Sequence, residues 1–186
     1  YHDSLTSIQV RGMMARMNRN QALLLIIALL TLPLIWLFVP EEKPGSLSSL
    51  EGVPLSTITG DKFKLSGIFT GKKILLVFWS ITCGTCIEEI PFMIKLHEKL
   101  KDRLTIIGVH PQGFPLSKIQ KFVRKIPEKI PYFLAVDEQG ILMKTYAVTV
   151  LPKVILINAK GEELFSHLGY DPSMESEVEH GITSLL

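Results

Sequence analysis

Short apolar runs alternate with amphipathic segments from about residue 53 to the end of the chain. This alternation predicts an α/β fold built in layers. Two of the runs, KILLVFW and LTIIGV, are almost uninterrupted by polar residues, which is typical of central parallel strands that are covered on both faces. The segments that we predict as strands are 73–79, 104–109, 132–136, 153–158 and 163–168. A turn from Asn158 to Gly161 separates the last two strands, which are predicted to form an antiparallel hairpin.

Helical spacing of apolar residues separates these strands. Residues 86–101 predict a helix with a kink at Pro91, and a capping box of Ser117 and Gln120 predicts the start of a second helix. A short helical piece follows the turn at 137–140, and Asp171 caps a helix that closes the chain. Before the first long strand, residues 54–68 predict a β-hairpin around a Gly-Asp turn.

A different pattern precedes this domain, because residues 22–39 form an uncharged apolar run of 18 residues. As a helix it would be about 27 Å long, close to the thickness of a bilayer core. Arginines precede the run and mainly glutamates follow it, so the N-terminal flank is predicted to stay in the cytoplasm.

We therefore predict four regions: a disordered cytoplasmic segment 1–20, a transmembrane signal anchor 21–39, a linker 40–52 rich in Pro, Gly and Ser, and an extracytoplasmic domain 53–186. A cleaved signal peptide is the alternative, but the run is long for one and no small-x-small cleavage pattern follows it. A buried core helix is the other alternative, and the absence of any polar face disfavours it.

Composition narrows the function. The chain has 20 basic and 18 acidic residues and a formal charge of +2, without a basic stripe, so nucleic acid is not an expected partner. Its 186 residues suffice for one domain with an appendage. Two cysteines can form at most one intrachain disulfide, which excludes a scaffold held by several bridges.

Both cysteines, Cys83 and Cys86, lie where the first long strand gives way to a helix. The free N–H groups and dipole of a helix N-terminus favour a negative charge, and they can lower a thiol pKa from about 8.5 to roughly 3.5 to 7.5. Cys86, one turn further on, can close a ring, so the pair forms a reversible dithiol. A structural disulfide and half of a metal site are the alternatives. A bridge with this spacing constrains the unfolded chain little, and the histidines that could complete a metal site are scattered.

The chain from about Val53 to its end resembles the thioredoxin fold and, within it, the membrane-anchored thiol-disulfide oxidoreductases of the TlpA and ResA type. PLSTITGDKFKLSGIFTGKKILLVFWSITCGTCIEEIP is similar to that family's hairpin, its GK before the core strand, its FW before the active site and its CxxCxxEIP. VTVLPKVILINAKGE is similar to its GVxGxPTxFLIDxxG. The resemblance covers about three quarters of the chain. It implies a thioredoxin-like α/β fold with a central mixed sheet flanked by helices and an N-terminal β-hairpin.

The resemblance also implies roles for single residues. Cys83 would be the nucleophile that attacks a partner's disulfide, and Cys86 the resolving thiol. Glu89 would influence the protonation of the cysteines, unless it is only a carboxylate on the helix surface. Pro152 would be a cis-proline that faces the active site and presents the backbone of Leu151 to an extended substrate strand.

Other residues in and around the predicted site each have two interpretations or depart from the family's pattern. Thr82 stands where the family usually has Trp, next to the nucleophile on the substrate side, and Val77 stands where cytoplasmic thioredoxins have a buried Asp. Trp79 packs under the site or shows an edge to the substrate. His110 ends a strand at the sheet edge where such folds place their sites, although a loop histidine is more often merely solvated. A basic cluster, Lys121, Arg124, Lys125 and Lys129, forms either a solvated helix face or a surface for anionic lipid.

The resulting hypothesis is an extracytoplasmic enzyme anchored in the cell membrane by a single span, which reduces disulfides in partner proteins without a cofactor or metal. By resemblance, apocytochrome c is the favoured client and a membrane thiol protein the electron donor. Two alternatives remain: an oxidant or isomerase with the same chemistry, and a non-catalytic copper or zinc chaperone on the same fold.

Overall fold

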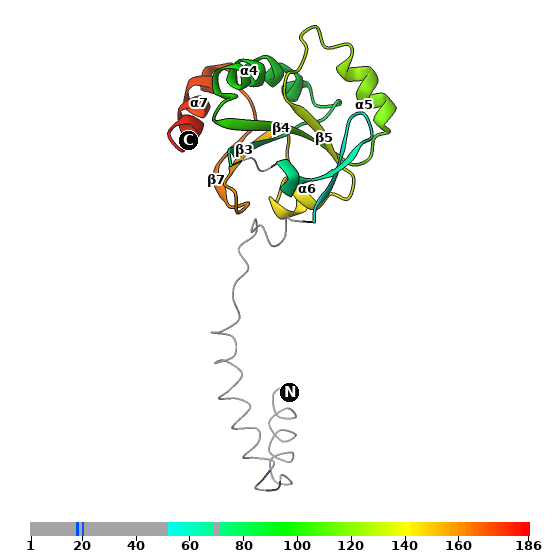
Figure 1. Cartoon of the computed structure of the whole chain (residues 1–186), viewed down its shortest axis with the longest axis vertical. Helices are drawn as coiled ribbons and strands as arrows, with labels where there is room; N and C mark the ends of the chain where they lie inside the picture. The colour runs from blue at the N-terminus through cyan, green and yellow to red at the C-terminus, as the bar shows by residue number, and fades with distance from the viewer. Residues whose placement is uncertain (1–17, 19, 21–51, 69–70) are drawn as a thin grey trace, which may run out of the picture. The chain divides into compact units, whose positions relative to one another are not determined.

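A computed structural model describes residues 18, 20, 52–68 and 71–186 (Figure 1). Nearly all of the predicted cytoplasmic segment, the predicted anchor 21–39 and the linker up to residue 51 lie outside the described residues. Within the part of the chain that is described, none of the helices has the length and apolar character needed to cross a bilayer.

The domain is organised around one seven-stranded mixed sheet with the order β2-β1-β5-β4-β3-β6-β7. Its centre consists of β3 (Lys73–Phe78), β4 (Leu104–Pro111) and β5 (Phe133–Asp137). β4 pairs in parallel with both of its neighbours. The predicted central parallel strands are thus confirmed, and β4 continues two residues beyond its predicted end.

Antiparallel strands complete both sides of the sheet. β1 (Pro54–Thr57) and β2 (Lys62–Lys64) form the predicted N-terminal hairpin, and β1 also pairs with β5. On the other side, β6 (Lys153–Ile157) pairs with β3 and with β7 (Glu163–Leu168). The second arm of the N-terminal hairpin is shorter than predicted, because Leu65 turns into the core and starts a 3-10 helix, η1 (Leu65–Ile68).

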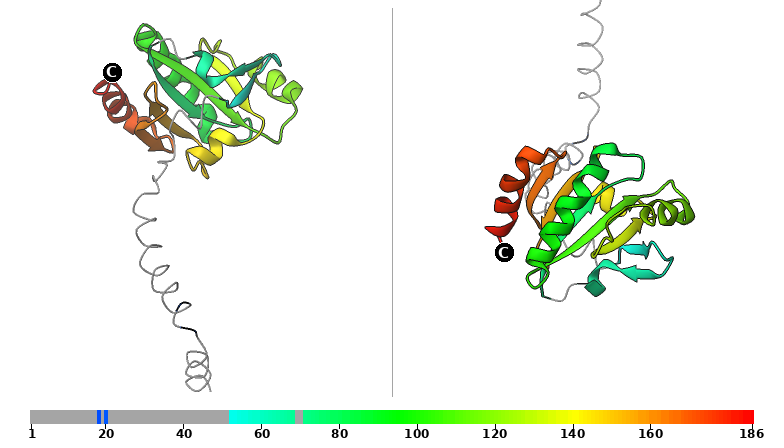
Figure 2. Two further views of the ribbon diagram at one scale, coloured as in Figure 1. Left: turned by 60° about the horizontal axis from the view of Figure 1, so that its bottom comes forward. Right: turned by 90° about the horizontal axis from the view of Figure 1, so that it is seen from above.

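Helices cover the two faces of the sheet. The helices are α4 (Gly84–Leu100), α5 (Leu116–Val123), α6 (Ile141–Thr145) and α7 (Glu175–Thr183), the last preceded by a 3-10 turn at Pro172–Met174. One core cluster contains side chains of α4 and α7, and a second contains side chains of η1 and α6. Figures 1 and 2 show α4 and α7 together on one side of the sheet and α6 on the other.

Strand β3 shows why its apolar run is continuous. Leu75 and Val77 contribute to the cluster under α4, whereas Ile74, Leu76 and Phe78 contribute to the cluster under α6. Successive side chains of a strand point to opposite faces, so a strand between two helical layers needs apolar residues at every position. The residues that follow β3, 79–83, connect its C-terminal end to the start of α4.

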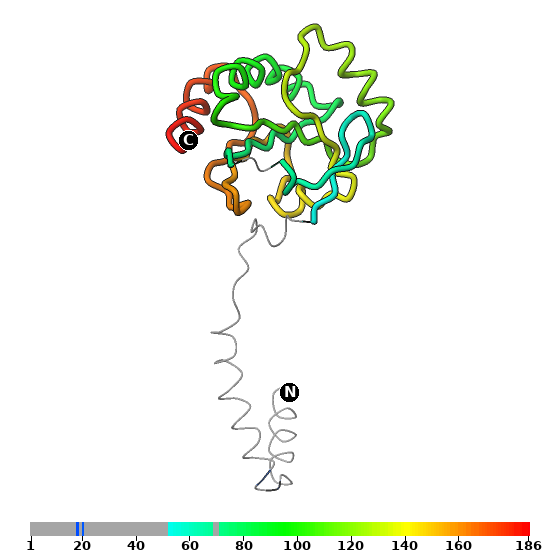
Figure 3. The backbone as a smooth tube through the Cα atoms, viewed as in Figure 1, coloured from blue at the N-terminus to red at the C-terminus, as the bar shows by residue number. Residues whose placement is uncertain are grey.

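The start of α5 differs from the prediction. Pro115 occupies the N-cap position without a side-chain hydrogen bond, and Ser117 already lies inside the helix. The Gln120 amide donates a hydrogen bond of 2.7 Å to the carbonyl of Ile58 instead of closing a capping box. The capping-box prediction is therefore wrong, because the Gln120 side chain ties the segment between β4 and β5 to the N-terminal hairpin. The backbone trace shows these two segments side by side (Figure 3).

Candidate active site

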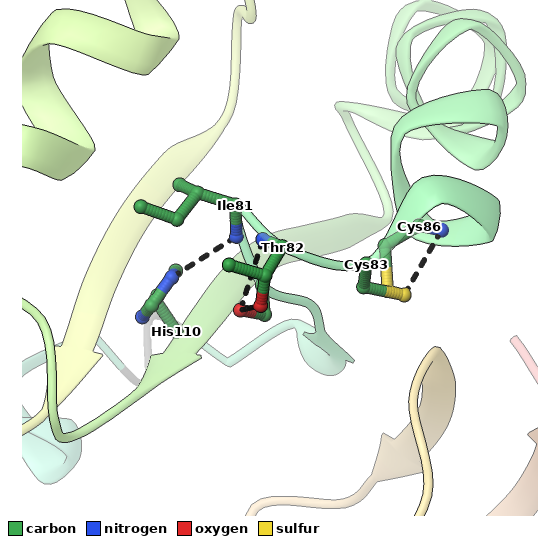
Figure 4. Close-up of a disulfide and its surroundings, with 6 residues drawn as sticks. Ile81, Thr82, Cys83, Cys86 and His110 are labelled. Carbon is green, nitrogen blue, oxygen red and sulfur yellow. Dashed lines mark hydrogen bonds between the residues drawn. A yellow bond between two sulfur atoms is a disulfide. The ribbon is translucent and has the colours of Figure 1, made fainter.

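The two cysteines form a disulfide at the start of α4 (Figure 4). Their sulfurs are 2.05 Å apart and their Cα atoms 5.2 Å apart. Cys83 is the N-cap residue and is half-buried, whereas Cys86 is 1% exposed. The Cys86 N–H donates a hydrogen bond of 3.2 Å to the Cys83 sulfur. The predicted placement is thus confirmed: the more accessible sulfur lies at the helix N-terminus, where a thiolate formed on opening the disulfide would be stabilised.

A short loop holds Cys83 in front of the sheet. The Trp79 N–H donates to the Val109 carbonyl at 3.1 Å and so continues the pairing of β3 with β4 by one residue. The Cys83 N–H then donates to the Ser80 carbonyl at 3.0 Å, which closes a tight turn. Within this turn the Ser80 and Thr82 hydroxyls are 3.1 Å apart. Thr82 is exposed beside the disulfide, so its side chain can meet a partner that approaches Cys83.

His110 is buried, in contrast to the solvated loop histidine that the sequence left as an alternative. It is 0% exposed, and its Nε2 accepts a hydrogen bond of 3.2 Å from the Ile81 N–H (Figure 4). Its Nδ1 lies 2.7 Å from the Pro111 carbonyl, which can only accept, so Nδ1 carries the proton. Burial lowers the pKa of His110, because the charged ring would lose its hydration. The neutral imidazole therefore anchors the loop that leads to Cys83.

Aromatic rings surround this histidine and extend under the loop. Trp79 meets the His110 ring edge to face, with ring centroids 5.4 Å apart, and Phe114 does so from another direction at 5.5 Å. Trp79 is only 3% exposed, which favours the predicted packing under the site over an edge that faces the substrate. The packing of its ring into the core under α4 leaves it no surface to offer to a substrate.

Glu89 is a buried carboxyl group and does not lie on the helix surface. It is 3% exposed, one turn after Cys86 on α4, and burial raises its pKa to about 8. Tyr132 is also buried, and its pKa is raised first by burial and then by the charge of Glu89. Glu89 is thus protonated at neutral pH and titrates in the range where thiols do. In the sequence, Tyr132 stands out only as the first residue of the predicted strand 132–136, and no local pattern indicates that it is buried together with Glu89.

The Leu151–Pro152 peptide bond is cis, as the resemblance implied. Pro152 is buried and Leu151 half-buried. The next residue, Lys153, pairs with Phe78 at the C-terminal end of β3. The cis-proline segment and the loop to Cys83 therefore lie at the same end of neighbouring strands. In the described part of the chain, no set of three or more His, Cys, Asp and Glu side chains is arranged to bind a metal ion.

The chain is similar to known redox proteins. Residues 47–182 match the Redoxin family. A "Thiol-disulfide oxidoreductase ResA" from Bacillus thuringiensis is 31% identical over 126 residues, which are 67% of this chain and 70% of the relative. A "Thioredoxin-like protein YneN" from Bacillus subtilis is 30% identical over 125 residues, 66% of this chain and 71% of the relative.

Solved structures show the same fold. The putative thiol:disulfide interchange protein DsbE from Chlorobium tepidum superposes with a TM-score of 0.62 and 28% identity, over 70% of this chain and 90% of that one. StoA from Bacillus subtilis superposes with a TM-score of 0.57 and 22% identity, over 69% of this chain and 94% of that one. At 22% identity, the similarity to StoA is a similarity of fold alone.

Proposed function

Since the chain belongs to the Redoxin family and is a thiol-disulfide oxidoreductase of the TlpA and ResA type, we propose that it reduces disulfides of client proteins outside the cytoplasm. One observation carries the proposal: a half-buried sulfur at a helix N-terminus is bonded to a buried one in the first turn. Only the first sulfur can meet a protein partner, and only the second is in place to displace that partner.

The reaction follows from this difference in exposure. In the reduced protein the Cys83 thiolate attacks one sulfur of the client disulfide; a bond forms between them, and the other client sulfur leaves as a thiolate. Cys86 then attacks the Cys83 sulfur and releases the client as a dithiol. The client gains two electrons and two protons, and the protein is left with the disulfide seen here. A thiol protein of the membrane would return the two electrons.

Proton transfer is the proposed role of Glu89. Cys86 must lose its proton to attack, and it is buried where water has little access. Glu89 lies one helical turn away on the same side of α4, and its pKa of about 8 is close to that of a thiol. The carboxylate form can accept the Cys86 proton, and the acid form can return it when the disulfide is reduced.

The proposal also includes a location, outside the cytoplasm at the cell membrane, and a client, apocytochrome c. The apolar run 22–39 supports a membrane anchor with the domain outside the cytoplasm. The resemblance to the TlpA and ResA type supports apocytochrome c as the client. Thr82, Leu151 and Pro152 would contact the client strand. Thr82 is exposed next to Cys83, and the other two precede Lys153, which pairs with Phe78 at the C-terminal end of β3.

Trapping of the client tests the proposal. Cys86→Ala removes the resolving thiol, so mixed disulfides on Cys83 should accumulate in membranes and be identified by mass spectrometry. Cys83→Ala is the matched control and should trap nothing. The reduction potential of the pair gives the direction: we expect a value below about −200 mV for a reductant, and a value near about −120 mV would indicate an oxidant. Failure to trap any client would contradict the proposal.

A further inference from the structure

An apolar groove of about 330 Å³ runs alongside the helix that starts at the disulfide. One wall belongs to α4 and the other to the end of α5 and the residues that follow it. The apolar side chains of these walls are Ile87, Ile90, Pro91, Phe122, Ile126 and Pro127. Pro91 and Pro127 are exposed and Ile87, Phe122 and Ile126 half-buried, so the groove is open to a ligand from solvent.

The α4 wall of the groove lies on the same side of the helix as Cys83. Ile87 is four residues after Cys83, and its N–H donates to the Cys83 carbonyl at 3.3 Å. Ile90 and Pro91 follow one turn later, so all of these residues share a face of α4 with Cys83. With a rise of about 1.5 Å per residue, the wall lies roughly 6 to 12 Å from Cys83 along the helix axis. An extended peptide at about 3.3 Å per residue covers this distance in two to four residues.

The chain segment that forms the far wall of the groove has a net positive charge. The segment 116–130 contains five basic residues and one acid, Glu128. Lys125 lines the groove opposite α4, together with Glu128. The remaining basic residues, all exposed, are Lys118, Lys121, Arg124 and Lys129. Glu88 is the exposed acid on the α4 side. This balance favours a ligand with net negative charge.

We propose that this groove is a subsite for the client, which takes a large apolar side chain two to four residues from the client's reactive cysteine, in a segment that also carries acidic residues. The inference rests on the proposed function, since it concerns the protein whose disulfide Cys83 attacks. Two features favour a client segment as the ligand of the groove. The groove lies on the face of α4 that begins at Cys83, and the basic residues of the segment 116–130 are complementary to acidic residues of a client. The apolar side chains of both walls supply affinity, and the basic residues of the segment 116–130 select the residues that flank the apolar one.

A single-turnover assay with synthetic peptides tests the subsite. Each peptide is made in an acidic and in a basic version. It has one cysteine in a mixed disulfide with thionitrobenzoate, and a Leu or a Ser at position two, three or four on either side. The pre-reduced protein attacks the peptide sulfur, releases coloured thionitrobenzoate and then frees the peptide thiol through Cys86. We expect the second-order rate constant to be about tenfold higher for the best Leu peptide than for its Ser partner. Reduction by dithiothreitol corrects for intrinsic differences between peptides.

Variants of the far wall and of a distant surface separate the outcomes. Ile126→Ser should reduce the Leu preference to less than about twofold, and Lys125→Glu should weaken the preference for acidic over basic peptides. Leu164→Ser, at an exposed apolar position on β7, is the matched control and should keep both preferences. Equal rates with Leu and Ser peptides in the wild-type protein would overturn the subsite and leave the proposed function intact. Absence of reaction with every peptide would overturn the proposed function itself.

Discussion

The imidazole of His110 accepts a hydrogen bond from the backbone N–H of Ile81, two residues before Cys83, at 3.2 Å. This bond joins the C-terminal end of β4 to the loop that leaves β3. The other ring nitrogen donates to the Pro111 carbonyl, which fixes the ring and its tautomer. The position of the accessible sulfur thus depends on a side chain 27 residues away in the sequence.

Removal of this acceptor should loosen the loop. His110→Ala leaves the Ile81 N–H without its partner, so we expect the free energy of unfolding to fall by about 1 to 3 kcal/mol. Hydrogen exchange at the Ile81 amide should become at least about tenfold faster by the same argument. His110→Gln keeps an acceptor and should restore part of the protection. His180→Ala, at an exposed position on α7, is the control and should not alter the exchange at Ile81. Unchanged exchange at Ile81 in His110→Ala would contradict this role.

The same bond should make stability depend on pH. Burial lowers the pKa of His110 below its ordinary 6.5, so the unfolded chain binds the proton more readily than the folded one. The contribution of His110 is therefore fully present above pH 6.5 and is lost as the pH falls from 6.5 toward the lowered pKa. Urea titrations at several pH values should show that the stability difference between wild type and His110→Gln shrinks on acidification. A difference that is constant with pH would refute this prediction.

Glu89 should give a pH dependence of the opposite sign. Burial raises its pKa from 4.5 to about 8, so the folded protein holds this proton more tightly than the unfolded chain. Its contribution is fully present below pH 4.5 and is lost as the pH rises through 8. Relative to wild type, Glu89→Gln should gain about 5 kcal/mol of stability between acidic and alkaline conditions. Glu88→Gln, at the exposed neighbouring position, is the matched control, and an equal gain in both variants would contradict a specific effect of the buried Glu89 carboxyl.

The packing of Trp79 on β4 gives a further prediction. A Cβ atom at Gly108 would lie 2.7 Å from Leu134 Cδ2 and 3.2 Å from Trp79 Nε1. Gly108→Ala should therefore lower the free energy of unfolding by about 1 to 3 kcal/mol, measured as a lower urea midpoint with an unchanged slope. Gly67→Ala is the control, because nothing lies within 4 Å of a Cβ there. Equal midpoints for the two variants would show that the Trp79 site can relax at no cost.

Several elements were predictable because their signals are local. The run KILLVF at 73–78 is apolar at every position, and this alone marks a strand covered on both faces. The hairpin of β6 and β7 is indicated by its turn residues, and Cys83 was placed at the start of α4 because a strand and a helical pattern meet there. The capping box failed for a reason that no local pattern contains: the Gln120 side chain reaches the carbonyl of Ile58 in another part of the sequence.

The order and spacing of apolar residues along the chain are enough to predict the layered α/β architecture and the position of the dithiol between a strand and a helix, since side-chain period and chain order fix both. The surroundings of the dithiol depend instead on how distant segments pack together. Glu89 and His110 had the residue types of a solvated surface, yet both are buried, because α4 and β4 pack against elements far away in the sequence. Burial changes the cost of charging a group, and that cost depends on every neighbour in space, which a one-dimensional pattern does not contain.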